Sequence, residues 1–291
     1  MSEPQIIFTG PSSRGWHRLQ QAAECLQKYA YTYGTGSGRN DGIVDREAEM
    51  KRPALVKGSL MHLALAQHYA RIYQEQQGDD PAAFVEPKDA VCFLADAQGT
   101  PQFKELVCEV YDKYAARYAD DDKRMKILGI ERLFEHVVQG KHLLTGRVDL
   151  MYEDEAGRPW VCDHKTTGRL TASHKKYYAA SGQLIGYQYL ARMNGHAIAG
   201  MKLNLIEVSE NPKFERITLP RGPHFEQHFE QTVVDIEESI ERMQASGRPV
   251  DEWPKAMNEL TCYHRYGACK FLDRCRWGPD HQVGGNWQWD G

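Results

Sequence analysis

The hydrophobic and polar positions along the first half of the chain change from a helical period to a strand period. Apolar and aromatic residues recur at helical spacing in residues 12–34, 57–77 and 101–124, and this spacing predicts three helices. In residues 127–154 apolar and polar residues alternate around a Gln-Gly pair at 139–140, which predicts two antiparallel strands joined by a turn. The first half is therefore expected to be helical and then to enter a sheet.

In the second half, predicted strands and helices alternate. We expect strands at 159–167 and 199–210, and helices at 181–195 and 224–247. A cysteine-bearing tail follows, and its sequence predicts no regular structure. Together these elements predict the mixed α/β fold class, with a sheet and flanking helices.

Composition is compatible with one large domain. The chain has 291 residues, of which 41% are hydrophobic, so it can bury a sizeable core. We expect a single domain over residues 1–291, divided into a mainly helical N-terminal part (12–125), an α/β core (126–222), and a C-terminal helix with a cysteine-bearing tail (223–291).

Charge and hydropathy exclude some classes of protein. The formal net charge of -4 gives no overall electrostatic argument for a nucleic-acid partner, so any phosphate binding must come from local basic groups. No apolar run is long enough to cross a bilayer, and residues 1–15 lack the basic region and apolar core of a signal peptide. We therefore expect no membrane partner and a cytoplasmic location.

Three charged residues lie on the predicted hairpin of residues 146–168. Asp163 and Lys165 are two positions apart, so they point to the same side of their strand, and Asp149 can lie across the hairpin from them. Two neighbouring carboxylates repel each other unless a cation lies between them, and hard oxygen ligands favour Mg²⁺ or Mn²⁺. The alternative is a cross-strand ion pair on a solvated sheet face.

Three further motifs accompany these charges in a set order. G-x-x-x-H covers Gly58 to His62, G-x-x-D covers Gly146 to Asp149, and Q-x-x-x-Y covers Gln183 to Tyr187, with D-x-K at Asp163 to Lys165. Over roughly residues 12–278 the chain resembles the RecB-type nucleases of the PD-(D/E)xK superfamily, which include CRISPR-associated adaptation exonucleases and phage recombination exonucleases. Each motif is weak alone, and their joint occurrence is specific.

The resemblance implies a restriction-endonuclease-like core and a set of active-site residues. It implies that His62, Asp149 and Asp163 bind the metal, together with the backbone carbonyl of His164. It implies catalytic roles for five side chains: Asp149, Asp163, Lys165, Gln183 and Tyr187. Lys165 would orient the attacking water and stabilise developing negative charge, while the metal lowers the pKa of that water.

Several of these residues have a structural interpretation as well. His62 could be a satisfied core histidine, and Gln183 and Tyr187, four apart on one helix face, could simply pack beside the sheet. Glu131 stands where relatives often have an acidic residue, but an exposed strand position would explain it equally well, and we leave it outside the ligand set.

Basic and aromatic residues follow the D-x-K strand closely. The basic side chains suit a phosphate-bearing substrate, although a solvated charged face explains them too; they are Arg169, His174, Lys175 and Lys176. Tyr177 and Tyr178 would add stacking surface for single-stranded bases.

The seven cysteines include one closely spaced trio near the C-terminus. Cys262, Cys269 and Cys275, with the distant Cys25, could close a four-ligand site. Iron–sulfur members of the resembled family carry one N-terminal cysteine and a C-terminal trio that bind a [4Fe–4S] cluster, usually with the spacing C-x2-C-x5-C, whereas this chain has C-x6-C-x5-C. A zinc site and unligated thiols remain alternatives. Cys92, Cys108 and Cys162 are expected to be small buried hydrophobic residues.

The leading functional hypothesis is a metal-dependent DNA nuclease, specifically an exonuclease that acts on ends or single strands in recombination or repair of DNA. The chain carries no G-x-x-x-x-G-K-[ST] loop, so it has no helicase motor of its own and would work alone or with a recombination partner protein. Two alternatives are a non-catalytic module that binds DNA or a partner through the nuclease fold, and a site-specific endonuclease of the same superfamily.

Overall fold

The computed structural model describes residues 4–35, 42–43, 52–219, 223–264 and 267–279. The chain divides into two compact units. One combines Met1–Trp16 with Arg46–Glu230, and the other combines His17–Asp45 with Gln231–Gly291. None of the helices in the described part of the chain combines the length and apolar character that crossing a bilayer requires.

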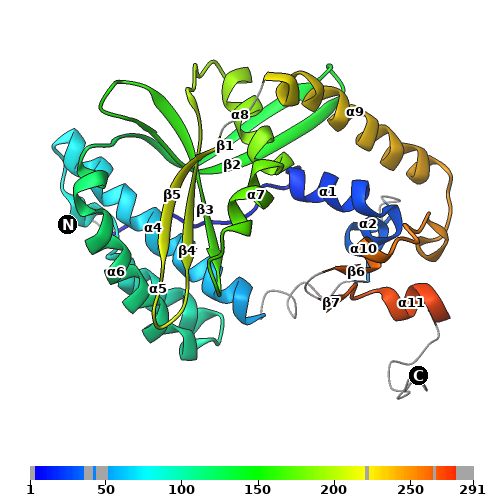
Figure 1. Cartoon of the computed structure of the whole chain (residues 1–291), viewed down its shortest axis with the longest axis horizontal. Helices are drawn as coiled ribbons and strands as arrows, with labels where there is room; N and C mark the ends of the chain where they lie inside the picture. The colour runs from blue at the N-terminus through cyan, green and yellow to red at the C-terminus, as the bar shows by residue number, and fades with distance from the viewer. Residues whose placement is uncertain (1–3, 36–41, 44–51, 220–222, 265–266, 280–291) are drawn as a thin grey trace. The chain divides into compact units, whose positions relative to one another are not determined.

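The first unit is built around a mixed sheet of five strands within the described residues, in the order β1-β2-β3-β4-β5 (Figure 1). Their bounds are Lys126–Val138, His142–Glu153, Pro159–Thr167, Gly200–Glu207 and Phe214–Leu219. β3 and β4 are parallel, and the other neighbouring pairs are antiparallel. The parallel pair requires a crossover between β3 and β4, and α7 (Ser173–Ala179) and α8 (Gly182–Met193) form it.

Three helices pack together beside this sheet: α4 (Pro53–Gln77), α5 (Pro87–Ala97) and α6 (Lys104–Lys123). α4 begins at a proline and ends before Gly78, whose φ of 78° places it in the left-handed region that glycine adopts readily. The helices and the sheet share one core cluster that includes Leu60, Leu65, Val107, Val110 and Leu150. The burial of these side chains fixes the position of α4 on the strands.

The second unit joins an N-terminal segment to the C-terminal part of the chain. Its main helices are α1 (Trp16–Glu24), α2 (Leu26–Tyr33) and α9 (Pro223–Ala245), and α1 and α9 each begin in the first unit. Trp253 is 1% exposed, and its ring stacks on Tyr29 with centroids 6.1 Å apart. Asp251 accepts hydrogen bonds from the Tyr31 hydroxyl at 2.7 Å and from two nitrogens of Arg274 at 2.7 Å each.

The expected mixed α/β fold is confirmed, and several boundaries agree closely with the sequence pattern. β3 spans the residues expected for it, while the first expected helix is interrupted at Cys25, whose extended backbone separates α1 from α2. The tail, expected to be irregular, contains α10 (Glu259–Cys262), β6 (Tyr263–His264), β7 (Gly267–Ala268) and α11 (Leu272–Trp277). These elements are too short for a periodic pattern, so tertiary contacts decide them. The sequence pattern also did not predict α5, α7 or β5.

We expect Trp253→Ala to lower the free energy of unfolding by about 3–5 kcal/mol, because it removes a fully buried ring that packs on Tyr29. The measurement is the denaturant midpoint followed by circular dichroism. Trp277→Ala is the matched control, since that ring is 53% exposed. Equal midpoints for the two variants would contradict this assignment of the core.

Candidate active site

The candidate site lies where β2 and β3 separate. The last backbone pair of their ladder on this side is Leu150 with Cys162, and Asp149 and Asp163 occupy the next positions. Beyond the ladder, the backbone N–H of His164 donates to Asp149 Oδ2 at 2.6 Å. The carboxylate thus takes the place of a strand partner, which holds it beside the D-x-K residues.

A chain of hydrogen bonds links the D-x-K residues to α8. Lys165 Nζ donates to Asp163 Oδ1 at 3.0 Å and to Gln183 Oε1 at 2.8 Å. Gln183 Nε2 in turn donates to the Tyr187 hydroxyl at 3.0 Å. The helix spacing of Gln183 and Tyr187 therefore directs both side chains toward the lysine, and the ammonium is held in one position.

Two glycines of the sequence motifs permit close approach between elements. A Cβ on Gly146 would lie 2.6 Å from Leu190 Cδ1 and 3.0 Å from Tyr187 Cδ1, so only glycine lets α8 pack this closely on β2. A Cβ on Gly58 would lie 2.9 Å from Thr166 Oγ1, so glycine also lets α4 cross next to β3. These contacts give a physical reason for both motif glycines.

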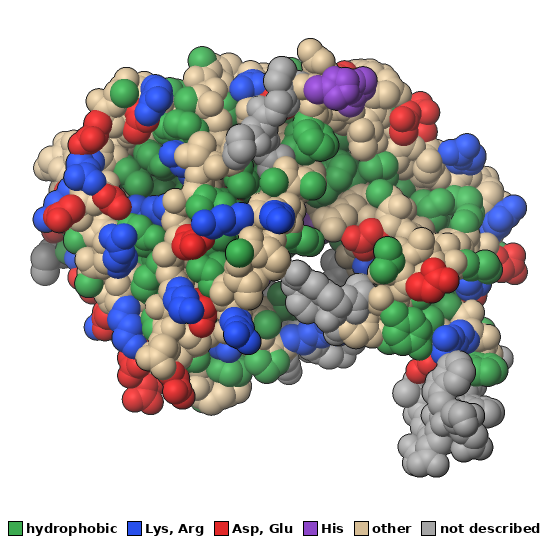
Figure 2. Space-filling view, in the orientation of Figure 1, with side chains coloured by type: hydrophobic (Ala, Val, Ile, Leu, Met, Phe, Trp, Pro, Cys, Tyr) green, Lys and Arg blue, Asp and Glu red, His purple; other side chains and the backbone are tan. Residues whose placement is uncertain are grey.

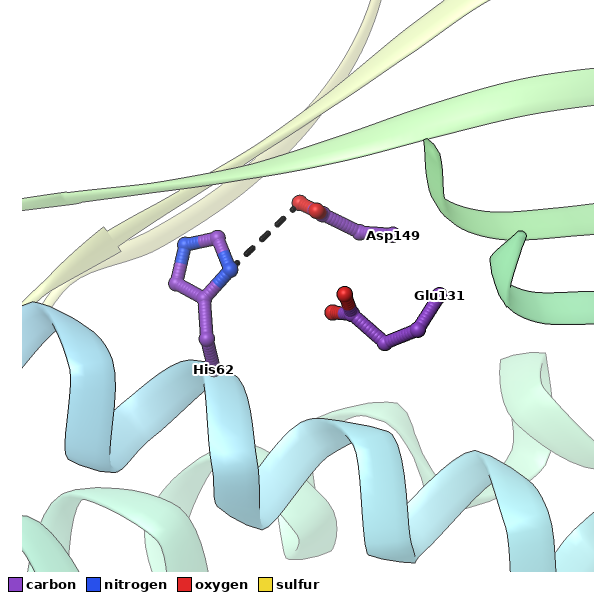
Figure 3. A group of neighbouring side chains, drawn as sticks. All are labelled: His62, Glu131 and Asp149. Carbon is purple, nitrogen blue, oxygen red and sulfur yellow. Dashed lines mark ion pairs between the residues drawn. The ribbon is translucent and has the colours of Figure 1, made fainter. Parts of the chain in front are cut away.

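His62 from α4 reaches Asp149, and Glu131 from β1 completes a group of three (Figure 3). One ligand atom of each residue lies within 4.8 Å of the others, and His62 Nδ1 is 3.6 Å from Asp149 Oδ2. The group offers two carboxylates and one imidazole. Asp163 lies close enough to this group for its charge to contribute to the pKa shift of His62.

Sequence reasoning left Glu131 outside the site, and the structure brings it in. Its neighbours Ile130 and Arg132 pair with Leu150 and Val148, which places Glu131 opposite Asp149. It is 8% exposed, and its φ of 48° is uncommon for a residue other than glycine. The signal was available in the sequence, because counting back from the Gln-Gly turn pairs residue 131 with residue 149.

Burial shifts the pKa values of Asp163 and of the group of three in the directions that favour their neutral forms. Burial raises the pKa of Asp163 to about 6, with a lowering contribution from Lys165 and a raising one from Asp149. Burial, followed by repulsion from Asp149, raises the pKa of Glu131, and burial also raises that of Asp149. Burial and the Lys165 charge lower the pKa of His62 to about 4. A neutral imidazole and clustered carboxylates suit a hard divalent cation, which would favour their charged forms.

Behind β3, the His164 ring points into a buried polar network. The ring stacks on Tyr69 at 5.7 Å, and its Nδ1 lies 2.9 Å from Asn204 Nδ2, at the matching position of β4. Asn204 Nδ2 also donates to the Tyr114 hydroxyl at 2.6 Å. Arg216 donates to both tyrosine hydroxyls, at 2.9 Å to Tyr69 and 2.6 Å to Tyr114. The network fixes the His164 side chain and with it the peptide between the two charged residues of the motif.

Asp122 neutralises the buried Arg216. The two side chains lie 2.7 Å apart and are 2% and 15% exposed, and Asp122 Oδ2 is also 3.1 Å from His68 Nε2. Although burial raises the pKa of Asp122, hydrogen bonding from His68 and the charge of Arg216 outweigh it and lower that pKa below its ordinary value. The pair therefore stabilises the fold while Asp122 is ionised.

We expect Asp122→Asn to lower the free energy of unfolding by about 3–5 kcal/mol at pH 7, because Arg216 is left buried without its counter-charge. Since the pKa of Asp122 is lowered in the folded state, this contribution is present above the unfolded-state pKa and is lost as the pH falls through the folded-state pKa. Unfolding midpoints of both proteins from pH 7 down to pH 3 test this, and a difference that grows toward acid pH would contradict it.

The four cysteines proposed as a ligand set line one pocket of the second unit. Its volume is 380 Å³, and all four thiols are half-buried and form no disulfide: Cys25, Cys262, Cys269 and Cys275. Burial raises the pKa of Cys275 to about 11, and the neighbouring Cys25 contributes to the shift. Of the other cysteines, Cys162 is buried as expected, whereas Cys92 and Cys108 are half-buried.

The basic and aromatic residues after β3 lie mostly on α7. His174 Nε2 is 3.4 Å from the Thr167 hydroxyl, and Lys175 forms an ion pair with Glu215 at 3.1 Å. Tyr177 is 54% exposed, while Tyr178 lies close enough to contribute to the raised pKa of Lys165. The structure thus brings this segment next to β3.

One comparison with known protein families agrees with this geometry. A family model described as the PD-(D/E)XK nuclease superfamily matches residues 16–276. A crystal structure of a candidate exonuclease from Eubacterium rectale is similar at 13% sequence identity and a TM-score of 0.49, over 93% of this chain and 90% of that chain. The crystal structure of the protein SSO0001 is similar at 16% identity and a TM-score of 0.29, over 66% and 77%. No curated protein matches the chain significantly in sequence.

Proposed function

Because the chain belongs to the PD-(D/E)XK nuclease superfamily, we propose that it is a metal-dependent deoxyribonuclease that hydrolyses phosphodiester bonds. One observation carries the proposal: two carboxylates, the half-buried Asp149 and the buried Asp163, meet beside Lys165 where β2 and β3 separate. A cross-strand ion pair on a solvated face, the structural alternative, does not fit this arrangement, because Asp163 is 1% exposed.

We assign Mg²⁺ or Mn²⁺ as the cofactor. His62, Glu131, Asp149 and Asp163 would hold the ion, with the His164 carbonyl that the family resemblance implies, and their oxygen-rich donor set fits a hard cation. When bound, the ion lowers the pKa of a water molecule and neutralises charge on the phosphate. Glu131, which the sequence pattern alone did not place among the ligands, adds the third carboxylate.

Lys165 supplies positive charge in this mechanism. Although burial lowers its pKa, the charges of Asp163 and Asp149 raise it above the ordinary value, so the side chain is cationic at neutral pH. An ammonium in that state cannot accept the proton of the attacking water. Its role is therefore to orient the water and to stabilise the negative charge that develops on the phosphate, held in place by Gln183.

We favour an exonuclease acting on DNA ends or single strands over a site-specific endonuclease, and a role in recombination or repair with a partner protein. The family resemblance of the motifs supports this assignment. Exposed Tyr177 beside the site would offer stacking surface for unpaired bases. A non-catalytic binding module is disfavoured because it has no need of buried carboxylates whose ionisation is costly.

We expect Asp163→Asn to lose at least about a thousandfold in cleavage rate, because it removes a metal ligand and the partner of Lys165. The assay follows internally labelled linear DNA, single- and double-stranded, beside a closed circle, with Mg²⁺ or Mn²⁺. Loss of linear DNA alone identifies an exonuclease, and cutting of the circle identifies an endonuclease.

Asp112→Asn is the matched control for this variant, since it makes the same chemical change at a side chain that is 54% exposed on α6. We expect it to retain wild-type activity. Full activity of Asp163→Asn would refute the active site, and a wild-type protein that binds DNA without cleaving it would favour the binding module.

We further propose that Cys25, Cys262, Cys269 and Cys275 bind a [4Fe–4S] cluster. One observation supports it: the four thiols line one pocket of the second unit. A zinc ion held by the same four thiolates is the alternative.

Anaerobically purified protein is accordingly expected to be brown and to contain iron and acid-labile sulfide in equal amounts. Cys275→Ala should yield colourless protein with a lower unfolding midpoint, because the site ties α2 to the tail. Cys92→Ala, a half-buried cysteine outside the pocket, should stay brown. One zinc per chain in a colourless preparation, or four freely alkylated thiols, would contradict the cluster.

A further inference from the structure

A second, small pocket lies beside the catalytic strand in the first unit. Its volume is 70 Å³, which is room for a few water molecules or one phosphate group and too little for a nucleotide. It is formed by the first turns of α4, the end of β3 and the residues that directly follow β3 and β4. It is lined by Ala54, Lys57, Thr166, Thr167, Gly168 and Val208.

The lining of this pocket is suited to an anion. Lys57 is half-buried, and its ammonium forms no ion pair or hydrogen bond with any described residue, in contrast to Lys165. The Thr166 hydroxyl is likewise without a hydrogen-bond partner among the described residues. No carboxylate lines the pocket. An ammonium and a hydroxyl in a concave site match the oxygens of a phosphate.

The position of the pocket relates it to the reaction site. Thr166 follows Lys165 along β3, so its side chain lies on the opposite face of the strand, where Gly58 lets α4 approach it, and Lys57 directly precedes Gly58. His62 lies about one helical turn further along α4 from Gly58. The same two elements that carry the candidate metal ligand and the catalytic lysine therefore also form the pocket.

We propose that this pocket binds a phosphate group of the DNA strand next to the phosphate that is cleaved. The inference rests on the proposed nuclease function and names how its substrate is held. The bound phosphate is either the terminal phosphate of the strand or an internal one. In both cases a second fixed point on the strand restricts rotation of the scissile phosphate at the metal site, which favours the geometry of attack.

The test measures DNA binding as a function of salt, with Ca²⁺ in place of Mg²⁺. Short single strands carry an internal fluorophore and end in a 5′-phosphate, a 3′-phosphate or two hydroxyls. We expect Lys57→Ala to weaken binding about tenfold at low salt and to reduce the slope of log K against log salt by about 1, because one phosphate contact is lost.

Four further variants distinguish loss of the pocket contact from general effects on binding. Lys57→Arg should restore most of the binding, since it keeps the charge. Thr166→Val should weaken binding by a few-fold and Thr166→Ser should not, because only the hydroxyl contacts the phosphate. Lys88 is 52% exposed on α5 and pairs with Asp112. Lys88→Ala should therefore leave the affinity and the salt slope unchanged.

Each outcome decides the proposal. An equal loss on all three strands assigns an internal phosphate, and a loss confined to one phosphate-ended strand assigns the terminal phosphate of that end. Unchanged affinity and slope for Lys57→Ala, or an equal loss for Lys88→Ala, would overturn the pocket, as would a wild-type protein that does not bind DNA. Binding with the expected slope change but no cleavage with Mg²⁺ or Mn²⁺ would instead refute only the nuclease function.

Discussion

Buried carboxylates that face one another at the fork between β2 and β3 are the constraint on which the rest of the first unit depends. Asp149, Asp163 and Glu131 all have a raised pKa because they are desolvated, and Asp149 repels the other two. Such a group destabilises the fold unless cations compensate it. Lys165 provides one positive charge, and a divalent ion at the same point would provide the remainder.

The surrounding elements hold this group together by close packing. Glycine at positions 58 and 146 lets α4 and α8 approach β3 and β2, and each helix brings polar side chains to the fork. On the other side of β3, the His164 ring is fixed by Asn204 and Tyr69, which belong to a network neutralised by Arg216 and Asp122. β3 is thus held by hydrogen bonds on both faces, which limits movement of its charged residues.

The second unit is stabilised by a different set of contacts. Its Trp253 ring stacks on Tyr29 and its Phe271 ring packs on Tyr31, while Asp251 accepts hydrogen bonds from Tyr31 and Arg274. Four thiols gathered in one pocket would add a metal-centred cross-link between α2 and the tail. Short elements such as α10 and α11 gain their order from such contacts, because they are too short to be stable alone.

The sequence by itself determined the long helices and strands, the mixed α/β class, and the motif residues from Gly58 to Tyr187. Hydrophobic periodicity and motif spacing are local properties of the sequence, so they can be recognised without knowledge of the fold. The pairing of Glu131 with Asp149 could also have been counted from the Gln-Gly turn, whereas the network behind His164 and the short elements of the tail depended on tertiary structure. Residues distant in sequence create them: Asn204 reaches His164 across a parallel strand pair, and Cys25 reaches the tail pocket only after the chain folds. No pattern within one segment encodes a contact whose partner is supplied by another.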